Sequence, residues 1–222
     1  MKEFNQFLGK KIVVELSGKR LLKGKLLDTG MDIMVITDKQ QFYYIPLAHV
    51  KNIKANLLAS NDSSDSAIEL PVEYQVDHLS TRQILNQARG LFAEVYVNGN
   101  KSIHGYVNGV LNDYFVIHSP IYKSIFISLH HFKWLIPYPP SHIPYSLQHQ
   151  SLSVKPINSS LPATFEEQCK KAEGSIVVYD LGSECNKVGR INQVSNGIID
   201  LVNAEGNSTI WNIRHLKTMY IP

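Results

Sequence analysis

The chain has 222 residues, of which 44% are hydrophobic, a share that is ordinary for a globular protein and excludes global disorder. Its formal net charge of +3 is mildly basic and lacks the concentrated positive charge of a dedicated nucleic-acid binder. No stretch approaches the roughly 18–20 consecutive apolar residues of a membrane-spanning helix, and the N-terminus lacks a signal peptide, so we expect synthesis in a reducing cytoplasm.

The first predicted repeat spans residues 1–56 and combines a short helix with a set of strands. Phe4, Phe7 and Leu8 have the i, i+3, i+4 spacing of an amphipathic helix, which Gly9 can end. Five strands are predicted from β-rich runs bounded by turn residues, at 12–16, 22–27, 33–37, 42–45 and 49–53.

The same order of elements is predicted twice more, in a second repeat at 80–138 and a third repeat at 164–222. The helices are expected over 82–88 and 165–172. The strands are expected at 93–97, 104–109, 114–118, 124–128 and 132–136, and at 176–179, 187–194, 198–202, 209–213 and 216–221. A module of this size buries only about 60% of its unfolded surface, so we expect the repeats to pack on one another or on partners.

Two linkers of different composition separate the repeats. Residues 57–79 include a Ser/Asp-rich stretch over 59–67 that we expect to be flexible. Residues 139–163 are rich in Pro, Ser and His and are expected to be extended.

The three repeats carry the same landmarks in register. A glycine follows the first turn and opens the second strand, at Gly24, Gly105 and Gly189, and the intervals are 105 − 24 = 81 and 189 − 105 = 84 residues. Self-similarity at nearly constant spacing indicates a triplicated small β module rather than a single enzyme cleft. A His-apolar-Lys motif closes each repeat, with His49 and Lys51, His131 and Lys133, and His215 and Lys217.

The repeated His and Lys permit two interpretations. Imidazole and ammonium groups at equivalent positions would contact an anionic partner, such as a phosphate, a carboxylate or an RNA backbone. Alternatively, each His caps the turn between the fourth and fifth strands through a hydrogen bond to the backbone, and each Lys faces solvent. We favour the second interpretation, because every repeat must rebuild its turn, whereas a binding site need not recur.

The sequence offers no motif for catalysis, metal binding or cofactor binding. No nucleophile elbow or phosphate-binding loop occurs. His130 and His131 are adjacent, so on a strand they would point to opposite faces and not chelate together. Cys169 and Cys185 lack the spacing of a zinc site; whether they pair is left open, with two reduced thiols favoured. We therefore expect a protein that is not an enzyme and has no cofactor.

A short helix followed by five bent strands, with a glycine opening the second, resembles the Sm-like (LSm) barrel. In the first repeat, Gly24-Lys25-Leu26 followed by Met31-Asp32 is similar to a shortened Sm pattern, with Asp32 where that family carries Asn. The resemblance implies three tandem Sm-like small barrels whose fourth and fifth strands pair by strand addition, within the chain or between chains. It also implies RNA binding as an alternative function.

A second resemblance is to the spore coat protein B family of endospore-forming bacteria. It rests on Gly24-Lys25-Leu26, on Tyr43-Tyr44 before Leu47-x-His49-Val50-Lys51-x-Ile53, and on the echoes Leu129-His130-His131-Phe132-Lys133 and Ile213-Arg214-His215-Leu216-Lys217. It implies a structural protein made in the mother-cell cytoplasm and placed in the spore coat, with other coat proteins or copies of itself as partners. Members of that family can carry a Ser/Lys/Arg-rich C-terminal tail. The sequence up to Pro222 contains no such tail, so we expect no regulation by tail phosphorylation.

Overall fold

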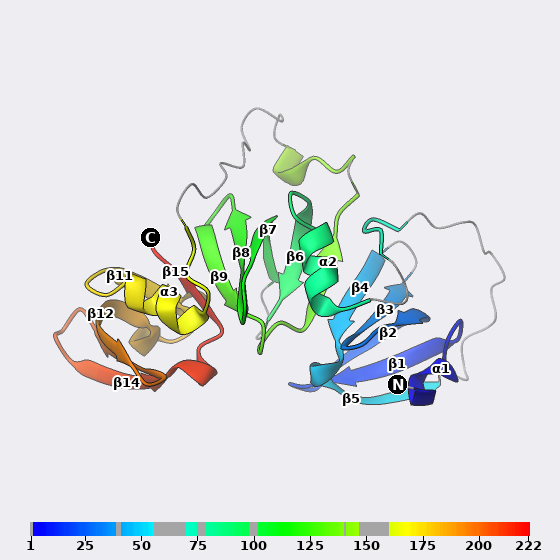
Figure 1. The fold of residues 1–222 in the computed structure, drawn as a ribbon, viewed down its shortest axis with the longest axis horizontal. Coiled ribbons are helices and arrows are strands. Elements are labelled where there is room, and N and C mark those ends of the chain that lie inside the picture. The colour runs from blue at the N-terminus through cyan, green and yellow to red at the C-terminus, as the bar shows by residue number, and fades with distance from the viewer. Residues whose placement is uncertain are drawn as a thin grey trace. The chain divides into compact units, whose positions relative to one another are not determined.

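The computed structural model describes residues 2–38, 41–55, 70–74, 79–97, 102–139, 141–146 and 160–222. The fold is mainly antiparallel β with short helices, as the sequence predicted (Figure 1). Most of the first predicted linker, including 59–67, and residues 147–159 of the second lie outside the described residues. In the described part of the chain, no helix combines the length and apolar character needed to cross a membrane.

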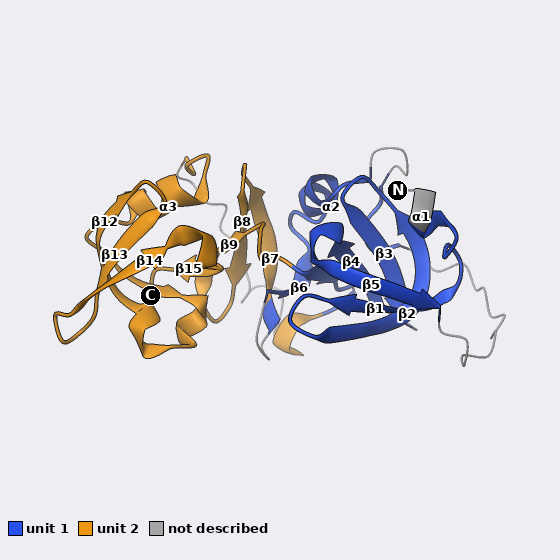
Figure 2. Ribbon diagram, turned by 90° about the horizontal axis from the view of Figure 1, so that it is seen from below, with its two compact units in different colours: residues 1–103, 133–142 blue, residues 104–132, 143–222 orange. Residues whose placement is uncertain are grey.

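The chain divides into two compact units (Figure 2). Unit 1 contains residues 1–103 and 133–142, and unit 2 contains residues 104–132 and 143–222. The division passes through the second repeat, whose first and fifth strands belong to unit 1 and whose third and fourth strands belong to unit 2.

Unit 1 contains the first repeat together with the helix and two strands of the second. Its antiparallel strands follow the order β6-β10-β4-β3-β2-β1-β5. The elements are α1 (Lys2–Asn5), β1 (Lys11–Leu16), β2 (Arg20–Thr29), β3 (Ile33–Asp38), β4 (Gln41–Pro46), a 3₁₀ turn (Leu47–His49), β5 (Val50–Ala55), α2 (Thr81–Gln87), β6 (Phe92–Tyr96) and β10 (Trp134–Pro137).

Unit 2 contains the third repeat and three strands of the second. The strand order is β14-β13-β12-β11-β15-β9-β8-β7, again antiparallel. The elements are β7 (Ser102–Val110), β8 (Tyr114–Ser119), β9 (Lys123–Ser128), α3 (Phe165–Lys171), β11 (Ile176–Tyr179), β12 (Val188–Ser195), β13 (Ile198–Val202), β14 (Ser208–Asn212) and β15 (Thr218–Tyr220). Further 3₁₀ turns lie at Pro144–Ser146, Asp180–Gly182, Cys185–Lys187 and Ile213–His215.

The repeat glycines lie inside the second strands and not in the turns before them. A Cβ atom on Gly24 would lie 2.5 Å from the carbonyl oxygen of Thr37, and one on Gly105 would lie 2.6 Å from that of His118. On Gly189 it would meet the carbonyl oxygen of Val202 in the same way. Only a residue without a side chain lets the second strand approach the third so closely.

All three second strands also bend at equivalent positions. A residue is inserted in the pairing of the second with the third strand between Leu26 and Asp28, between Val107 and Gly109, and between Ile191 and Gln193. A β-bulge of this kind increases the local twist and bend of its strand. In the first and third repeats, the glycine and the bulge together bend the second strand around an apolar core.

The first and third repeats share one strand order: fourth, third, second, first, fifth. In both, the fifth strand pairs with the first and does not close on the fourth. The fourth strand of one repeat instead pairs with the fifth strand of the next, β4 with β10 in unit 1 and β9 with β15 in unit 2. The edge pairing between repeats expected from the sequence is thus present within the chain.

Candidate assembly interfaces

The junction in unit 1 joins β4 of the first repeat to β10 of the second. Tyr44 lies opposite Leu135, and both are fully buried. Next to this pair, Trp134 stacks on Tyr96 with ring centroids 3.9 Å apart and meets Tyr43 edge-on at 6.4 Å. Trp134 and Tyr96 belong to the apolar core of the first repeat, so the second repeat supplies part of that core.

Lys133, in the closing motif of the second repeat, also binds the first repeat at this junction. Its Nζ donates to the carbonyl oxygen of Ser17, in the first turn of the first repeat, at 2.9 Å and lies 5.8 Å from the Tyr96 ring centroid. The residue is only 7% exposed, so the expectation that each motif Lys faces solvent is wrong here. A carbonyl and an aromatic face compensate for part of the ammonium group's lost hydration.

A second contact in unit 1 ties the helix of the second repeat to the first. The Oδ1 atom of Asp32 accepts a hydrogen bond from the backbone N–H of Thr81, the first residue of α2, at 2.7 Å. Leu79 accepts from Met31 through their backbones at 2.8 Å. Leu79 and Val72 are buried, so the end of the predicted first linker is packed, which the sequence analysis missed.

The junction in unit 2 repeats this arrangement one repeat later. Met219 of β15 lies opposite Phe126 of β9, and they are 0% and 7% exposed. The flanking Tyr220 contacts Tyr122, with ring centroids 5.4 Å apart. Phe126 shares the apolar core of the third repeat with Tyr114 and Met219, so the outer face of the second repeat completes the core of the third.

An aspartate again ties the following helix in place. The Oδ1 atom of Asp113 accepts from the backbone N–H of Phe165, the first residue of α3, at 2.8 Å. Tyr114 donates its hydroxyl to the carbonyl oxygen of Pro162 at 2.7 Å. Asp113 lies 81 residues after Asp32, at the equivalent position. The third repeat carries Gly197 at this position.

The departure from the Sm pattern was therefore informative. Asp32 stands where the Sm family carries Asn, and the sequence analysis treated it only as a mismatch. The structure gives Asp32 and Asp113 a shared role, because each carboxylate accepts from the start of the next repeat's helix. Negative charge at that end of a helix is favourable.

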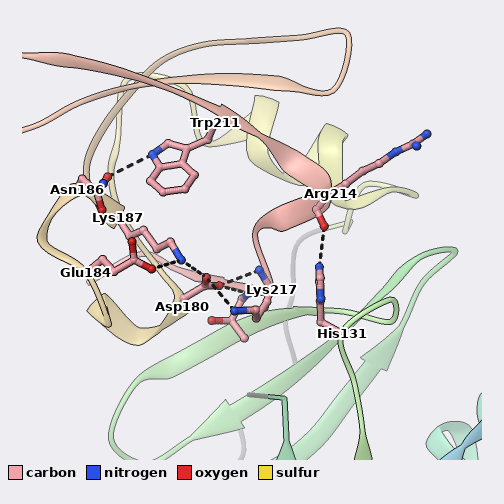
Figure 3. A network of polar contacts seen from close by, with 9 residues as sticks. His131, Asp180, Glu184, Asn186, Lys187, Trp211, Arg214 and Lys217 are labelled. Carbon is pink, nitrogen blue, oxygen red and sulfur yellow. Dashed lines mark hydrogen bonds and ion pairs between the residues drawn. The ribbon is translucent and has the colours of Figure 1, made fainter. Parts of the chain in front are cut away.

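A buried charge network holds β15 in the unit 2 junction (Figure 3). Lys187 Nζ lies 2.8 Å from Asp180 Oδ2 and 2.9 Å from Glu184 Oε1, and the Lys187 and Asp180 side chains are 7% and 5% exposed. The Oδ1 atom of Asp180 accepts from the backbone N–H groups of Lys217 at 2.8 Å and Thr218 at 3.2 Å. Burial opposes the charge of Lys187, but its bonds to Asp180 and Glu184 outweigh that effect and raise the pKa of its ammonium group.

The same network reaches the outermost strand of the third repeat. The indole Nε1 of Trp211, on β14, donates to the carbonyl oxygen of Asn186 at 3.2 Å, and Lys187 Nζ lies 5.2 Å from the Trp211 ring centroid. The sequence analysis did not identify Asp180 or Lys187. Asp180 lies in a short 3₁₀ turn that has no counterpart in the predicted elements, and Lys187, predicted to open the strand at 187–194, instead ends another 3₁₀ turn.

The histidines of the closing motifs have different partners. His49 Nδ1 lies 3.1 Å from Ser17 Oγ in its own repeat. His131 Nε2 lies 2.7 Å from the carbonyl oxygen of Arg214, in the third repeat, so the bond is to backbone as expected but spans two repeats. Burial lowers the pKa of His131, which favours a neutral ring whose Nε2–H donates to that carbonyl. His215 is exposed.

The remaining motif lysines also differ. Lys51 is half exposed, with its Nζ 3.5 Å from Glu15 Oε1. Lys217 contributes its backbone to the Asp180 network, and its Nζ lies 3.9 Å from Asp180 Oδ2. Because Lys51 and Lys217 lie next to carboxylates, neither presents uncompensated positive charge to an anion.

A cavity of about 490 Å³ opens between the second and third repeats in unit 2. Its lining includes Asp113, Glu166, Asn212, Arg214 and His130. Both carboxylates are engaged with backbone, Asp113 with Phe165 N and Glu166 with Gly197 N at 2.9 Å. The site can hydrogen-bond a polar group, and its two carboxylates outnumber its one guanidinium, that of Arg214.

The cysteines and potential metal ligands give no further site in the described residues. Cys169 is buried and Cys185 is exposed, and the two are not bonded to each other. Burial raises the pKa of the Cys169 thiol to about 12, so it is protonated and unreactive at neutral pH. Among the residues with described positions, no three His, Cys, Asp or Glu side chains gather as metal ligands would.

The chain is similar to a known domain family and to a protein of Bacillus subtilis. Residues 164–219 match the model of the YwrJ third domain, a span that begins where the third repeat was predicted to begin. The chain is 44% identical over 225 residues to the uncharacterized protein YwrJ of Bacillus subtilis (strain 168), and the match covers 100% of both sequences.

Proposed function

The chain belongs to the YwrJ family, and we propose that it is a non-enzymatic assembly protein of the bacterial spore coat, built of three Sm-like repeats that associate through strand edges. One observation carries the proposal: the same edge-to-edge junction occurs twice, between β4 and β10 and between β9 and β15. In each, a fourth strand is completed by the fifth strand of another repeat. Strand addition of this kind joins modules through main-chain hydrogen bonds, which supports an assembly role.

The Sm-like part of the proposal is supported by features that the repeats share. The strand order, the glycine in the second strand and the bulge after it recur at equivalent positions. These features produce a small, strongly bent sheet whose fourth and fifth strands remain available for pairing.

The assignment to the spore coat rests on the resemblance of the closing motifs to those of spore coat protein B. The test is a fluorescent fusion of the full chain, followed through sporulation beside unfused fluorescent protein. We expect the fusion to collect at the forespore surface and to remain with purified spores. A uniform signal in vegetative cells, or release of the fusion when spores are washed, would contradict the coat assignment.

RNA binding is a second candidate, because Arg214, His130 and Asn212 line the unit 2 cavity. Arg and amide side chains at an open polar cavity can contact phosphate and bases. Asp113 and Glu166 weaken the case, since they place negative charge where a phosphate would lie. If RNA is the ligand, retention should fall steeply with salt and Arg214→Ala should reduce it; unchanged retention in Arg214→Ala would remove this candidate.

A further inference from the structure

Two strands at the ends of the strand order take no part in the two junctions within the chain. The fourth strand of the third repeat, β14, ends the strand order of unit 2, and the fifth strand of the first repeat, β5, ends that of unit 1. In the described part of the chain, no strand pairs with the outer edge of either. One fourth strand and one fifth strand therefore have open edges of the kind that the two junctions use.

The two junctions share one register, which extends to the leftover strands. Leu135 lies opposite Tyr44, and Met219 lies opposite Phe126. Phe126 follows Tyr44 by 82 residues and Met219 follows Leu135 by 84, so both pairs occupy equivalent positions. The same offsets place Ile210 at the position equivalent to Phe126 (126 + 84 = 210) and Ile53 at the position equivalent to Leu135 (135 − 82 = 53).

Ile210 is exposed at a position that a neighbouring repeat covers on the other two fourth strands. Its equivalents Tyr44 and Phe126 are 0% and 7% exposed, whereas Ile210 is 63% exposed. On the other strand, Ile53 is only partly buried against the core of the first repeat. The third repeat receives Phe126 of the second into its core, whereas no residue of an earlier repeat is among the described residues that form the core of the first.

We propose that copies of the protein add head to tail, with β5 of one copy pairing antiparallel to β14 of another and Ile53 opposite Ile210. The inference rests on the proposed assembly function and specifies its partner, a second copy of this chain. Asn52 then lies opposite Trp211 and Lys54 opposite Thr209, following the pairs Thr218–Ile127 and Tyr220–Ile125.

This contact between copies is weaker than the junctions within the chain. β5 carries Asn52 and Lys54 where β10 carries Trp134 and Ile136, so less apolar surface is buried. Lysines on an edge strand also oppose indiscriminate pairing. Asp200 lies opposite Ile210 on the neighbouring strand β13 and provides negative charge that complements Lys54 of β5. Association is therefore reversible, concentration-dependent and weakened by salt.

Disulfide trapping tests the register directly. Ile53→Cys and Ile210→Cys are made in separate full-length chains that also carry Cys185→Ser, so that buried Cys169 is the remaining native thiol. Mild oxidation of the mixture should give a crosslinked dimer, because directly opposed residues meet disulfide geometry. The matched control pairs Ile53→Cys with Ile176→Cys, whose parent residue is 61% exposed on β11. Equal crosslinking in both mixtures, or none in the first, overturns the proposed register.

Sedimentation of the full chain over a range of concentrations tests the association itself. The mass should rise with concentration, less so at high salt, and Ile210→Lys should weaken association about tenfold or more by opposing the β5 lysines. Ile176→Lys adds the same charge elsewhere in the third repeat and should associate like the unmodified chain. Circular dichroism checks that both variants are folded.

A chain that stays monomeric at every concentration and salt overturns head-to-tail addition, and Asn52 and Lys54 are then caps that end the array. The coat assignment is judged separately by the localisation of the fusion. A monomeric chain that still collects on spores retains the proposed function, with other coat proteins as partners. A self-associating chain that never reaches spores retains the head-to-tail contact and loses the coat assignment.

Discussion

The strands β4 and β14 hold the same place in their repeats but differ in what surrounds them. From Phe42 to Pro46, β4 has buried residues on both faces, and Tyr44 is completely covered. Along β14, exposed residues alternate with half-buried ones, and Ile210 is open to solvent. The difference arises because another repeat follows β4, with β10 at its edge and Tyr74, in the segment before α2, in contact with the Tyr44 ring.

The aspartate that binds the helix of the next repeat, here called the tether, also differs between the first two repeats and the third. Asp32 and Asp113 accept from the helix of the next repeat, whereas Gly197 occupies this position in the third. The edge, the outer face and the loop of a repeat are thus all adapted to whether a neighbour follows.

The largest effect should come from Gly105→Val, which removes the close approach common to all repeats. The added side chain would enter the space of Ile117 Cγ2 and the carbonyl oxygen of His118. Displacing backbone in this way should cost about 4 kcal/mol or more of unfolding free energy. Urea denaturation measures the loss. Gly109→Ala is the control in the same strand, since its Cβ would lie 3.5 Å from Leu161 Cδ1, an ordinary contact.

The next effect concerns the charge network that belongs to the unit 2 junction. Asp180→Ala leaves Lys187 buried with one carboxylate fewer and removes the acceptor for the N–H groups of Lys217 and Thr218. Breaking a buried pair from one side destabilises by about 3–5 kcal/mol. Glu184→Ala is the control, because that side chain is 56% exposed and its loss should cost under about 1 kcal/mol. Equal losses in the two variants would mean that burial of Asp180 does not set its contribution.

The raised pKa of Lys187 gives this network a direction in pH. A lysine whose pKa is higher in the folded state contributes stability that is complete below the unfolded value. That contribution is lost as the pH rises through the folded value. The network should therefore persist through neutral pH and weaken only in strong alkali.

The sequence predicts features that depend on neighbouring residues better than features that depend on contacts between repeats. The predicted elements are confirmed within a few residues, and 176–179 and 198–202 match β11 and β13 without change, because turn residues and β-rich runs are local signals. The junction partners of Tyr44 and Phe126 were not assigned, since strand addition leaves no local pattern. Lys133 was placed in solvent, because the sequence does not reveal that Ser17 of another repeat lies within its reach.

A smaller effect should follow when each tether is removed in turn. Asp32→Ala should loosen the start of α2, and Asp113→Ala that of α3, each costing about 1–2 kcal/mol as the loss of a helix-capping contact does. Hydrogen exchange should quicken in the helix whose tether is missing and not in the other. Asp38→Ala, at the exposed end of β3, is the control. Faster exchange throughout the chain in both variants would show that the aspartates support the whole fold and not one junction each.

The smallest effect is a pH dependence confined to the unit 2 junction. Burial lowers the pKa of His131, its bond to the Arg214 carbonyl opposes this shift, and Lys217 adds to it. A histidine whose pKa is lower in the folded state contributes stability that is complete above its unfolded value of about 6.5 and is lost as the pH falls below it. His131→Gln can still donate to the Arg214 carbonyl but does not titrate. Its unfolding free energy should therefore fall less than that of the unmodified chain between pH 8 and pH 5, whereas exposed His215→Gln should leave the dependence in place. If the unfolding free energy of His131→Gln and of the unmodified chain changes equally with pH, protonation of His131 does not destabilise the unit 2 junction. That junction then differs from the one in unit 1 in its Asp180 network and not in its response to acid.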